Sequence, residues 1–410
     1  MYNYKIINGQ YSNNSLYDVV PIKAQDTFLI DKKNKRYLDL RSGLWNVSLG
    51  YQPDIYSKIS KEFDNLLTKQ LPYLDNHSFK HPIYQETAET ILKFVGKGFN
   101  NVIYTNSGSE NTELSLKLSN YINKKGSKSK ILTFKNSYHG TFFGGMSVSG
   151  IDQELNQIFN PKYGYVTFLE YPTSIESENE ILKKVNLICS DYDVMFIEPV
   201  LASAGVYTTT IEFMNKLIKI LHKNNVIVVF DEVATGFYRT GNRFYFNQLD
   251  YIPDLLCLSK GINNGITPFG CVCIGSNLNE KLKNSVQSME HFSTQNGNLL
   301  GILSANIVIH YYIKNADIIN QKVQSIESVF REILFNSELQ YRKQGAMLAI
   351  KIKKDHATVL VKELEKLGIL TYLYFNNNEE GLSIFPPFNI DLKVLKKALR
   401  IIIKHSLNYQ

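Results

Sequence analysis

The stretch Val226-Ile-Val-Val-Phe-Asp231-Glu-Val-Ala-Thr-Gly decides the fold class of this chain. A short β-branched apolar run ends there in a carboxylate and is followed by a glycine-containing turn. Further along, Pro253-Asp-Leu-Leu-Cys-Leu-Ser-Lys260-Gly has the same layout but ends in a lysine. Continuous apolar runs of this length, bounded by turn residues, are typical of strands buried on both faces of a parallel sheet.

Similar apolar runs recur through the middle of the chain and alternate with longer amphipathic stretches, such as Glu110–Tyr121 and Thr210–His222. The alternation predicts an α/β fold whose large domain holds a mostly parallel seven-stranded sheet between helices. Because open α/β sheets bind ligands beyond the carboxyl ends of their strands, polar residues after these runs are the candidates for a functional site. The seven predicted strands are Val102–Thr105, Lys130–Phe134, Tyr165–Leu169, Val194–Glu198, Val226–Phe230, Leu255–Ser259 and Cys271–Gly275.

The two ends of the chain do not continue this alternation. Thr27–Ile30 and Tyr37–Leu40 form a predicted hairpin, whereas the C-terminal part predicts helices and strands in an α+β arrangement. We therefore expect an N-terminal segment (residues 1–55) that joins a small α+β domain (residues 306–410). A large domain that holds the site is expected between them (residues 56–305).

Composition and charge limit the classes of protein to consider. At 410 residues and 44% hydrophobic content, the chain is long enough for one large core and a smaller one. Its net charge of +7 comes largely from lysines that are scattered along helical stretches rather than gathered into a block. We therefore expect no nucleic-acid partner.

Targeting signals are not visible in the sequence. The N-terminus, MYNYKIINGQYSNNS, lacks the layout of a secretory signal, and no apolar run reaches the roughly 18 residues that cross a bilayer. Only four cysteines occur, too few for a disulfide framework in a chain of this length. We expect a cytoplasmic protein with reduced thiols, no membrane partner and no metal site, and we expect Cys271 and Cys273 to pack on one face of a strand.

Lys260 stands directly after an apolar strand, between a serine and a glycine. Beyond a core strand, an amine that is partly removed from water has a lowered pKa and can attack an aldehyde. The same amine can then move a proton as an acid and base. Most lysines of this chain are solvated surface charges, so the prediction depends on the strand-end position and on the neighbouring motifs.

Asp231 also follows a buried strand, where an ionised carboxylate is costly unless it meets a positive partner. A protonated pyridine nitrogen would be such a partner, and the carboxylate would keep that ring an electron sink. The structural alternative is an aspartate that caps the turn before Thr235-Gly236. Glu198, which follows its own strand, has the same ambiguity.

The segment Thr105-Asn-Ser107-Gly108-Ser109 runs from a strand through a glycine-containing turn into a helix. Free backbone N–H groups at such a helix start suit a phosphate, and the serines would add hydroxyls. Thr294, in a second polar turn, would add another hydroxyl. The alternative for both segments is an ordinary helix cap.

Tyr138 follows the strand that ends at Phe134 and is placed to lie flat on a heteroaromatic ring. The chain holds 26 tyrosines, and a tyrosine at a strand end more often packs than contacts a ligand. His139 beside it is equally consistent with a structural role.

Taken together and in this order, these segments resemble the class III (ornithine/GABA/ω-amino acid) aminotransferases of fold type I, which use pyridoxal 5'-phosphate (PLP). The likeness spans nearly the whole chain, from Gly43-Leu-Trp-Asn46 through Pro386-Pro387-Phe. Its specific part is Asp231-Glu-Val-Ala-Thr-Gly-Phe-Tyr-Arg-Thr-Gly combined with Pro253-Asp and Ser259-Lys260-Gly. The resemblance implies a ping-pong transfer of an amino group from an amine or amino acid donor to an aldehyde or keto acid acceptor.

The resemblance also implies individual roles around the cofactor ring. Lys260 would hold PLP covalently as a Schiff base, and Asp231 would lie at the pyridine nitrogen. Val233 would lie under one face of the ring and Tyr138 over the other.

At the phosphate, the resemblance implies Gly108 and Ser109 from the same chain and Thr294 from the neighbouring subunit. The family works as homodimers with shared active sites, so the resemblance implies a dimer here too.

Departures from the family pattern bear on the substrate. Ala234 stands where the ornithine and GABA branch has Gln, and no Arg lies between Arg342 and Arg400, although many relatives place a carboxylate-binding Arg shortly before the Pro-Pro pair. Without that arginine, whose guanidinium would bind a carboxylate with two hydrogen bonds, a plain α-amino acid is a poorer substrate for at least one half-reaction. Trp45 and Tyr207 are candidates for an apolar substrate pocket, with interface core as the alternative for Trp45.

Relatives of this fold also catalyse racemisation, 1,2-amino migration and lyase reactions with the same lysine and aspartate. A PLP-dependent isomerase, racemase or lyase is therefore the alternative to a transaminase, and a binding scaffold without turnover is a third possibility.

Overall fold

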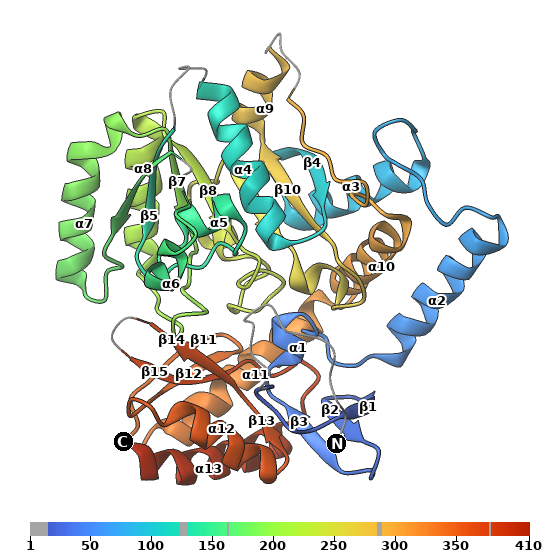
Figure 1. The fold of residues 1–410 in the computed structure, drawn as a ribbon, viewed down its shortest axis with the longest axis vertical. Helices are drawn as coiled ribbons and strands as arrows, with labels where there is room; N and C mark the ends of the chain where they lie inside the picture. Colours follow the sequence, from blue (N-terminus) through green and yellow to red (C-terminus); the bar gives the residue numbers. More distant parts are fainter. Residues whose placement is uncertain (1–14, 124–128, 162–163, 285–288, 377–378) are drawn as a thin grey trace.

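The computed structural model describes residues 15–123, 129–161, 164–284, 289–376 and 379–410. A large α/β part built around one sheet lies above a smaller part that holds two further sheets (Figure 1). Among the described helices, none is long and apolar enough to cross a membrane. The expectation that the N-terminus carries no secretory signal falls mainly on residues 1–14, which lie outside the described residues.

The central sheet has seven strands in the order β4-β10-β9-β8-β7-β5-β6. Neighbouring strands from β9 through β6 run parallel, whereas β10 is antiparallel to both β4 and β9. The predicted mostly parallel, seven-stranded sheet is therefore confirmed. Its strands are β4 (Phe99–Thr105), β5 (Lys130–Phe134), β6 (Tyr165–Leu169), β7 (Val194–Ile197), β8 (Ile227–Asp231), β9 (Leu255–Leu258) and β10 (Gly270–Gly275).

Both faces of this sheet are covered by helices, which explains why its strands are apolar throughout. Val229 and Cys257 pack with residues of α4 and α9 in one core, whereas their sequence neighbours Val228 and Leu256 belong to a second core on the other side. The helices of this part are α2 (Pro53–Thr68), α3 (Pro82–Val95), α4 (Gly108–Asn123), α5 (Phe143–Val148), α6 (Gln153–Gln157), α7 (Ile175–Ile188), α8 (Ile211–Lys223), α9 (Ser276–Lys283) and α10 (Leu299–Lys314).

Local capping accounts for where several helices begin. Thr210 accepts a hydrogen bond from the Phe213 N–H at 3.0 Å and starts α8. Asp391 accepts from the N–H groups of Lys393 and Val394 and starts the last helix. Each side chain satisfies backbone donors that the helix itself leaves free.

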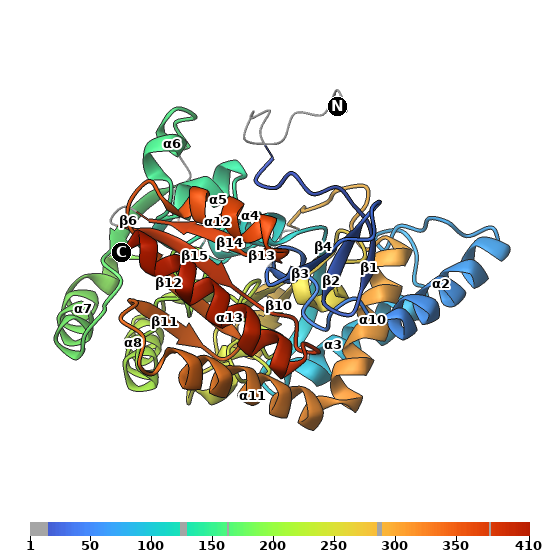
Figure 2. The same cartoon turned by 90° about the horizontal axis from the view of Figure 1, so that it is seen from below.

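The smaller part is formed by the C-terminal residues together with the N-terminal strands (Figure 2). One of its sheets has the order β11-β12-β15-β14, and the other has the order β1-β2-β3-β13. The strands are β1 (Pro21–Gln25), β2 (Phe28–Asp31), β3 (Arg36–Asp39), β11 (Tyr341–Gln344), β12 (Met347–Ile352), β13 (Ile369–Leu370), β14 (Tyr372–Phe375) and β15 (Glu380–Ile384). The helices are α11 (Ala316–Leu334), α12 (Ala357–Lys366) and α13 (Leu392–Ser406).

The parallel pairing of β3 with β13 joins the N-terminal segment to the C-terminal part of the chain. The expected upper boundary of the large domain, residue 305, falls inside the unbroken helix α10. The divisions at residues 55 and 305 stay predictions.

Candidate active site

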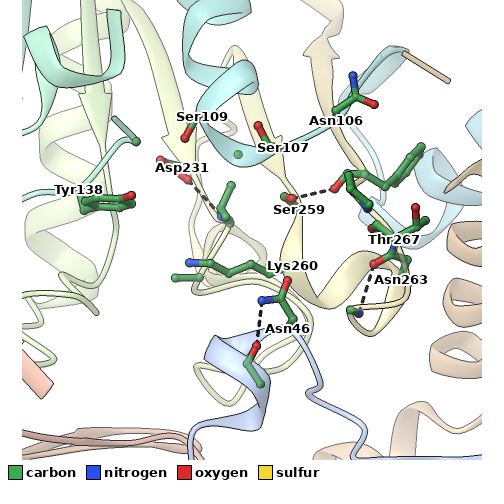
Figure 3. Close-up of a pocket in the computed structure, with 18 of the residues that line it drawn as sticks. Asn46, Asn106, Ser107, Ser109, Tyr138, Asp231, Ser259, Lys260, Asn263 and Thr267 are labelled. Carbon is green, nitrogen blue, oxygen red and sulfur yellow. Dashed lines mark hydrogen bonds between the residues drawn. The ribbon is translucent and has the colours of Figure 1, made fainter. Parts of the chain in front are cut away.

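A cavity of about 550 Å³ opens where the central sheet meets the smaller part of the molecule. Figure 3 shows Lys260 crossing this cavity, with Asp231 above it, Tyr138 to one side and Asn46 below. Most lining residues follow the ends of central strands, which is where an α/β sheet is expected to bind a ligand. Those lining residues that the sequence analysis singled out are Ser107, Gly108, Ser109, Tyr138, Asp231, Val233 and Lys260.

Lys260 begins a short 3-10 turn directly after β9 and has a left-handed backbone, with φ +47°. Its side chain is half-buried in the cavity wall, and the loss of water around it lowers the pKa of its ammonium group. The carboxylates of Asp231 and Glu198 oppose this shift, because they favour the charged amine. The site therefore supplies a lysine that loses its proton more readily than a surface lysine does.

Asp231 is the last residue of β8 and is 6% exposed. One carboxylate oxygen, Oδ2, lies 2.9 Å from Nδ1 of His139, and the other, Oδ1, accepts the Val233 N–H at 3.1 Å. Nε2 of His139 is buried and has no hydrogen-bond partner among the described residues. The carboxylate is thus held in a fixed orientation at the wall of the cavity.

Glu198 follows β7 and accepts two backbone N–H groups, from Tyr138 and from Ala202, both at 3.1 Å. Burial, followed by the nearby charge of Asp231, raises its pKa to about 8. These two hydrogen bonds tie the Tyr138 segment to the loop that carries Ser203, another residue of the cavity wall.

The phosphate candidates lie together at the start of α4, which begins at Gly108. The first N–H groups of a helix lack partners within the helix, so those of Gly108 and Ser109 are available to a ligand. A side chain at Gly108 would place its Cβ 2.9 Å from Val233, and one at Gly140 would place it 2.5 Å from the Ser109 hydroxyl. Both glycines therefore let the backbone lie closer to Val233 and to Ser109 than any other residue would allow.

Trp45 ends an unusual turn, α1 (Ser42–Trp45), in which all four residues have positive φ, from +48° to +66°. A left-handed conformation costs on the order of 1–2 kcal/mol for each residue other than glycine. Trp45 is 7% exposed, and its ring lies under the Lys260 ammonium, 4.5 Å from the ring centroid. Nothing in the residue pattern predicts this turn.

Three predicted residues do not line the cavity: Trp45, which nevertheless contacts the Lys260 ammonium, Tyr207 and Thr294. Tyr207 is half-buried and lies under the guanidinium of Arg342, which also pairs with Glu379. Thr294 is exposed and outside the cavity lining, and its carbonyl accepts the Tyr73 hydroxyl at 2.7 Å. Neither Tyr207 nor Thr294 reaches the Lys260 site within one chain.

Sequence reasoning missed several polar residues of the cavity. Asn106 lines it and donates to Ser293 and Asn296, so that β4 is connected to the polar turn before α10. Asn46 lines the opposite side and donates to the carbonyl oxygens of the left-handed turn. The only available signal was position, since Asn106 precedes the predicted phosphate loop and Asn46 follows Trp45.

The described residues fit PLP in the chemistry of their donors. A half-buried lysine amine, a buried carboxylate and a helix start with two serine hydroxyls face one cavity, and they correspond to the aldehyde, the ring nitrogen and the phosphate of that cofactor. Tyr138 and Val233 line the same cavity and are available to its ring faces.

Comparison with known proteins gives one family match, to the family described as aminotransferase class-III, over residues 10–405. An acetylornithine aminotransferase of Bacillus cereus is 27% identical over 391 residues, which cover 93% of this chain and 93% of that protein.

Solved structures show the same fold. A transaminase from the marine bacterium Virgibacillus superimposes with a TM-score of 0.85 at 22% identity and covers 100% of this chain and 96% of that one. A PMP-bound form of an aminotransferase from Vibrio fluvialis superimposes with a TM-score of 0.84, also at 22% identity, with 97% of each chain covered.

Proposed function

The chain belongs to the class III aminotransferases, and we propose that Lys260 and Asp231 are the residues that carry its reaction. It is an enzyme that transfers amino groups with PLP on a fold of type I. The names of the similar proteins are those of transaminases, and nothing among them favours the isomerase, racemase or lyase alternative.

The bound cofactor supplies an aldehyde that captures an amine and a protonated ring that withdraws electrons from the adjacent carbon. Asp231 keeps a proton on the ring nitrogen, because its buried carboxylate favours a positive partner. The hydrogen bonds from Val233 and His139 hold that carboxylate in place while leaving lone pairs for the ring.

Lys260 has two tasks in this proposal. Its Nζ would hold PLP covalently in the resting enzyme. Once an incoming amine had displaced it, the free Nζ would accept a proton and donate it again. Attack on the aldehyde and uptake of the proton both need the neutral amine, and burial favours that form by lowering the lysine pKa.

The remaining cavity residues position the cofactor. Ser107, Gly108 and Ser109 bind its phosphate at the start of α4, where free N–H groups and the helix dipole favour an anion. Tyr138 and Val233 lie against the two faces of its ring.

A homodimer with shared active sites completes the proposal. Thr294 binds the phosphate in the partner's site, which agrees with its exposed position outside the cavity of its own chain. Exposed apolar side chains lie on its own segment and on the segment of Tyr73 that bonds to it: Tyr73, Phe79 and Phe292 are 40%, 56% and 51% exposed. The four cysteines are buried free thiols, which supports the cytoplasm as its location.

The described residues define the substrate less closely than they define the cofactor. Among the described residues that line the cavity there is no arginine, so this chain offers a substrate carboxylate no guanidinium of its own. We propose Trp45 as part of the substrate pocket, for an amine or aldehyde, and Tyr207 as a residue of its outer edge. The small-molecule donor is an amine or amino acid, and the acceptor is an aldehyde or keto acid.

A single observation carries the proposal: a half-buried lysine faces a cavity that also holds a buried aspartate and a helix start. In the test, the full chain is saturated with PLP and treated with borohydride, and covalent cofactor is measured by the mass of the Lys260 peptide. Lys260→Ala should lose all covalent cofactor, whereas Lys281→Ala, at an exposed position on α9, should retain it. If Lys260→Ala still forms a borohydride-stable link, the lysine assignment is wrong.

A further inference from the structure

The ammonium of Lys260 lies over the face of Trp45, 4.5 Å from the ring centroid. A cation at this distance is attracted by the negative face of an indole ring, and tryptophan is the strongest of the aromatic partners. Trp45 is the only tryptophan in the sequence. This contact joins the smaller part of the molecule to the lysine at the end of β9.

Trp45 is held firmly in this position. The left-handed turn is fixed by the Ser42 hydroxyl, which donates to the Phe385 carbonyl at 2.6 Å, and by the Trp45 N–H, which donates to the Arg41 carbonyl at 2.7 Å. The indole packs on the Phe385 ring with centroids 4.7 Å apart, and Tyr372 meets it edge-on. A strained backbone persists where the surrounding structure enforces it, and here it directs one ring toward one amine.

We propose that Trp45 is a positioning residue for Lys260: in the cofactor-free chain, the ring face of Trp45 holds the lysine ammonium. The inference rests on the proposed role of Lys260. It adds a resting place for the free amine, which would otherwise pair with a carboxylate. The contact acts only on the charged form, so it opposes loss of the proton until the aldehyde is present.

Other charged and titratable groups surround the same amine. Asp231, on β8, and Glu198, after β7, both favour its charged form, and burial favours the neutral form. Tyr138, from the segment after β5, lies near Asp231, and His139 is bonded to that carboxylate. A test must therefore change the ring under the amine and leave these four groups in place.

The measurement is the pH dependence of the rate at which the cofactor-free full chain captures added PLP. The rate follows the neutral fraction of Lys260 and so reports its apparent pKa. Trp45→Leu keeps an apolar side chain but removes the π face, and it should lower this pKa by about 0.5–1.5 units. Trp45→Phe should give a smaller shift in the same direction. Phe385→Leu weakens the support of the indole but keeps its face, so it should shift the pKa less than Trp45→Leu does.

Fluorescence gives a second readout on the unmodified chain, because all tryptophan emission comes from Trp45. In the cofactor-free protein this emission should titrate with the same pKa as PLP capture, and Lys260→Met should abolish the titration. The inference is overturned if Trp45→Leu captures PLP with the wild-type pKa, or if the emission step persists in Lys260→Met. Failure of the wild-type chain to form a borohydride-stable link at Lys260 would instead contradict the proposed function. If Trp45→Leu does not fold, Trp45→Phe and the fluorescence titration decide the question.

Discussion

At the scale of single residues, Glu198 is the group whose proton should make stability depend on pH. Its pKa in the folded chain is raised from 4.5 to about 8, because burial and the charge of Asp231 disfavour the carboxylate. Between these two values the folded chain binds this proton more tightly than the unfolded chain does. The contribution of Glu198 to stability must therefore fall as the pH rises from about 4.5 to about 8, and it is constant outside that window.

The prediction concerns how much the unfolding free energy of the cofactor-free chain changes between pH 5 and pH 8. The loss in unfolding free energy between pH 5 and pH 8 should be smaller in Glu198→Gln than in the wild type by on the order of 2–4 kcal/mol, since glutamine binds no proton there. Urea unfolding at both pH values measures it. Glu154→Gln, at an exposed position on α6, should keep the wild-type difference. Equal pH differences in wild type and Glu198→Gln would show that this carboxyl does not titrate in the window.

A site residue could be predicted from the sequence only where the pattern that indicates it lies in the neighbouring residues. Lys260 and Asp231 each end an apolar run, so their position at the rim of the sheet followed from the pattern alone. The contact of Asp231 with His139 spans 92 positions, and that of Tyr138 with Glu198 spans 60. Such contacts depend on the strand order, which periodicity does not encode.

At the scale of elements, the strands could be predicted from the sequence, whereas the strained left-handed turn at Ser42–Trp45 could not. The runs Lys130–Phe134 and Tyr165–Leu169 match β5 and β6 at both ends, because each is bounded by polar residues. By contrast, Ser42–Trp45 contains three residues that ordinarily avoid left-handed φ, so propensity argues against the observed turn. Tertiary hydrogen bonds and the packing of Trp45 maintain it.

A pair of substitutions tests whether this turn is left-handed. Gly43→Ala should lower the free energy of unfolding by at least about 1 kcal/mol, because φ is +55° and the new Cβ would lie 2.7 Å from Val47 Cγ2. Leu44→Gly should stay within about 1 kcal/mol of the wild type, since relief of strain at φ +59° offsets the greater freedom of the unfolded chain. Denaturant midpoints of the two variants provide the measurement. A larger loss for Leu44→Gly than for Gly43→Ala would contradict the observed conformation.

At the scale of the whole molecule, Arg239 connects the parts that enclose the cavity. Its guanidinium is completely buried and donates to the carbonyls of Ala346 and Pro386 and to the hydroxyl of Ser48. No carboxylate pairs with it among the described residues, and burial lowers its pKa to about 9. The loop after β8, the C-terminal sheet and the N-terminal segment thus share one charged side chain, so the arrangement around Lys260 is determined by residues far from it in sequence.

The proposed assembly of two chains also belongs to this scale, and complementation tests it. Thr294→Asp should weaken PLP capture at least tenfold, because it brings a carboxylate to the phosphate in the partner's site, whereas Thr173→Asp, at another exposed threonine, should not. Lys260→Ala removes the lysine of its own site but supplies an intact Thr294. When equal amounts of the two variant chains are mixed and reassociate at random, half of the dimers are hybrids, and each hybrid has one complete site. At a PLP concentration that saturates complete sites but not the weakened sites of Thr294→Asp, borohydride should then fix cofactor on about a quarter of all chains. If mixed dimers form but fix no more cofactor than the separate variants, Thr294 does not act across the interface.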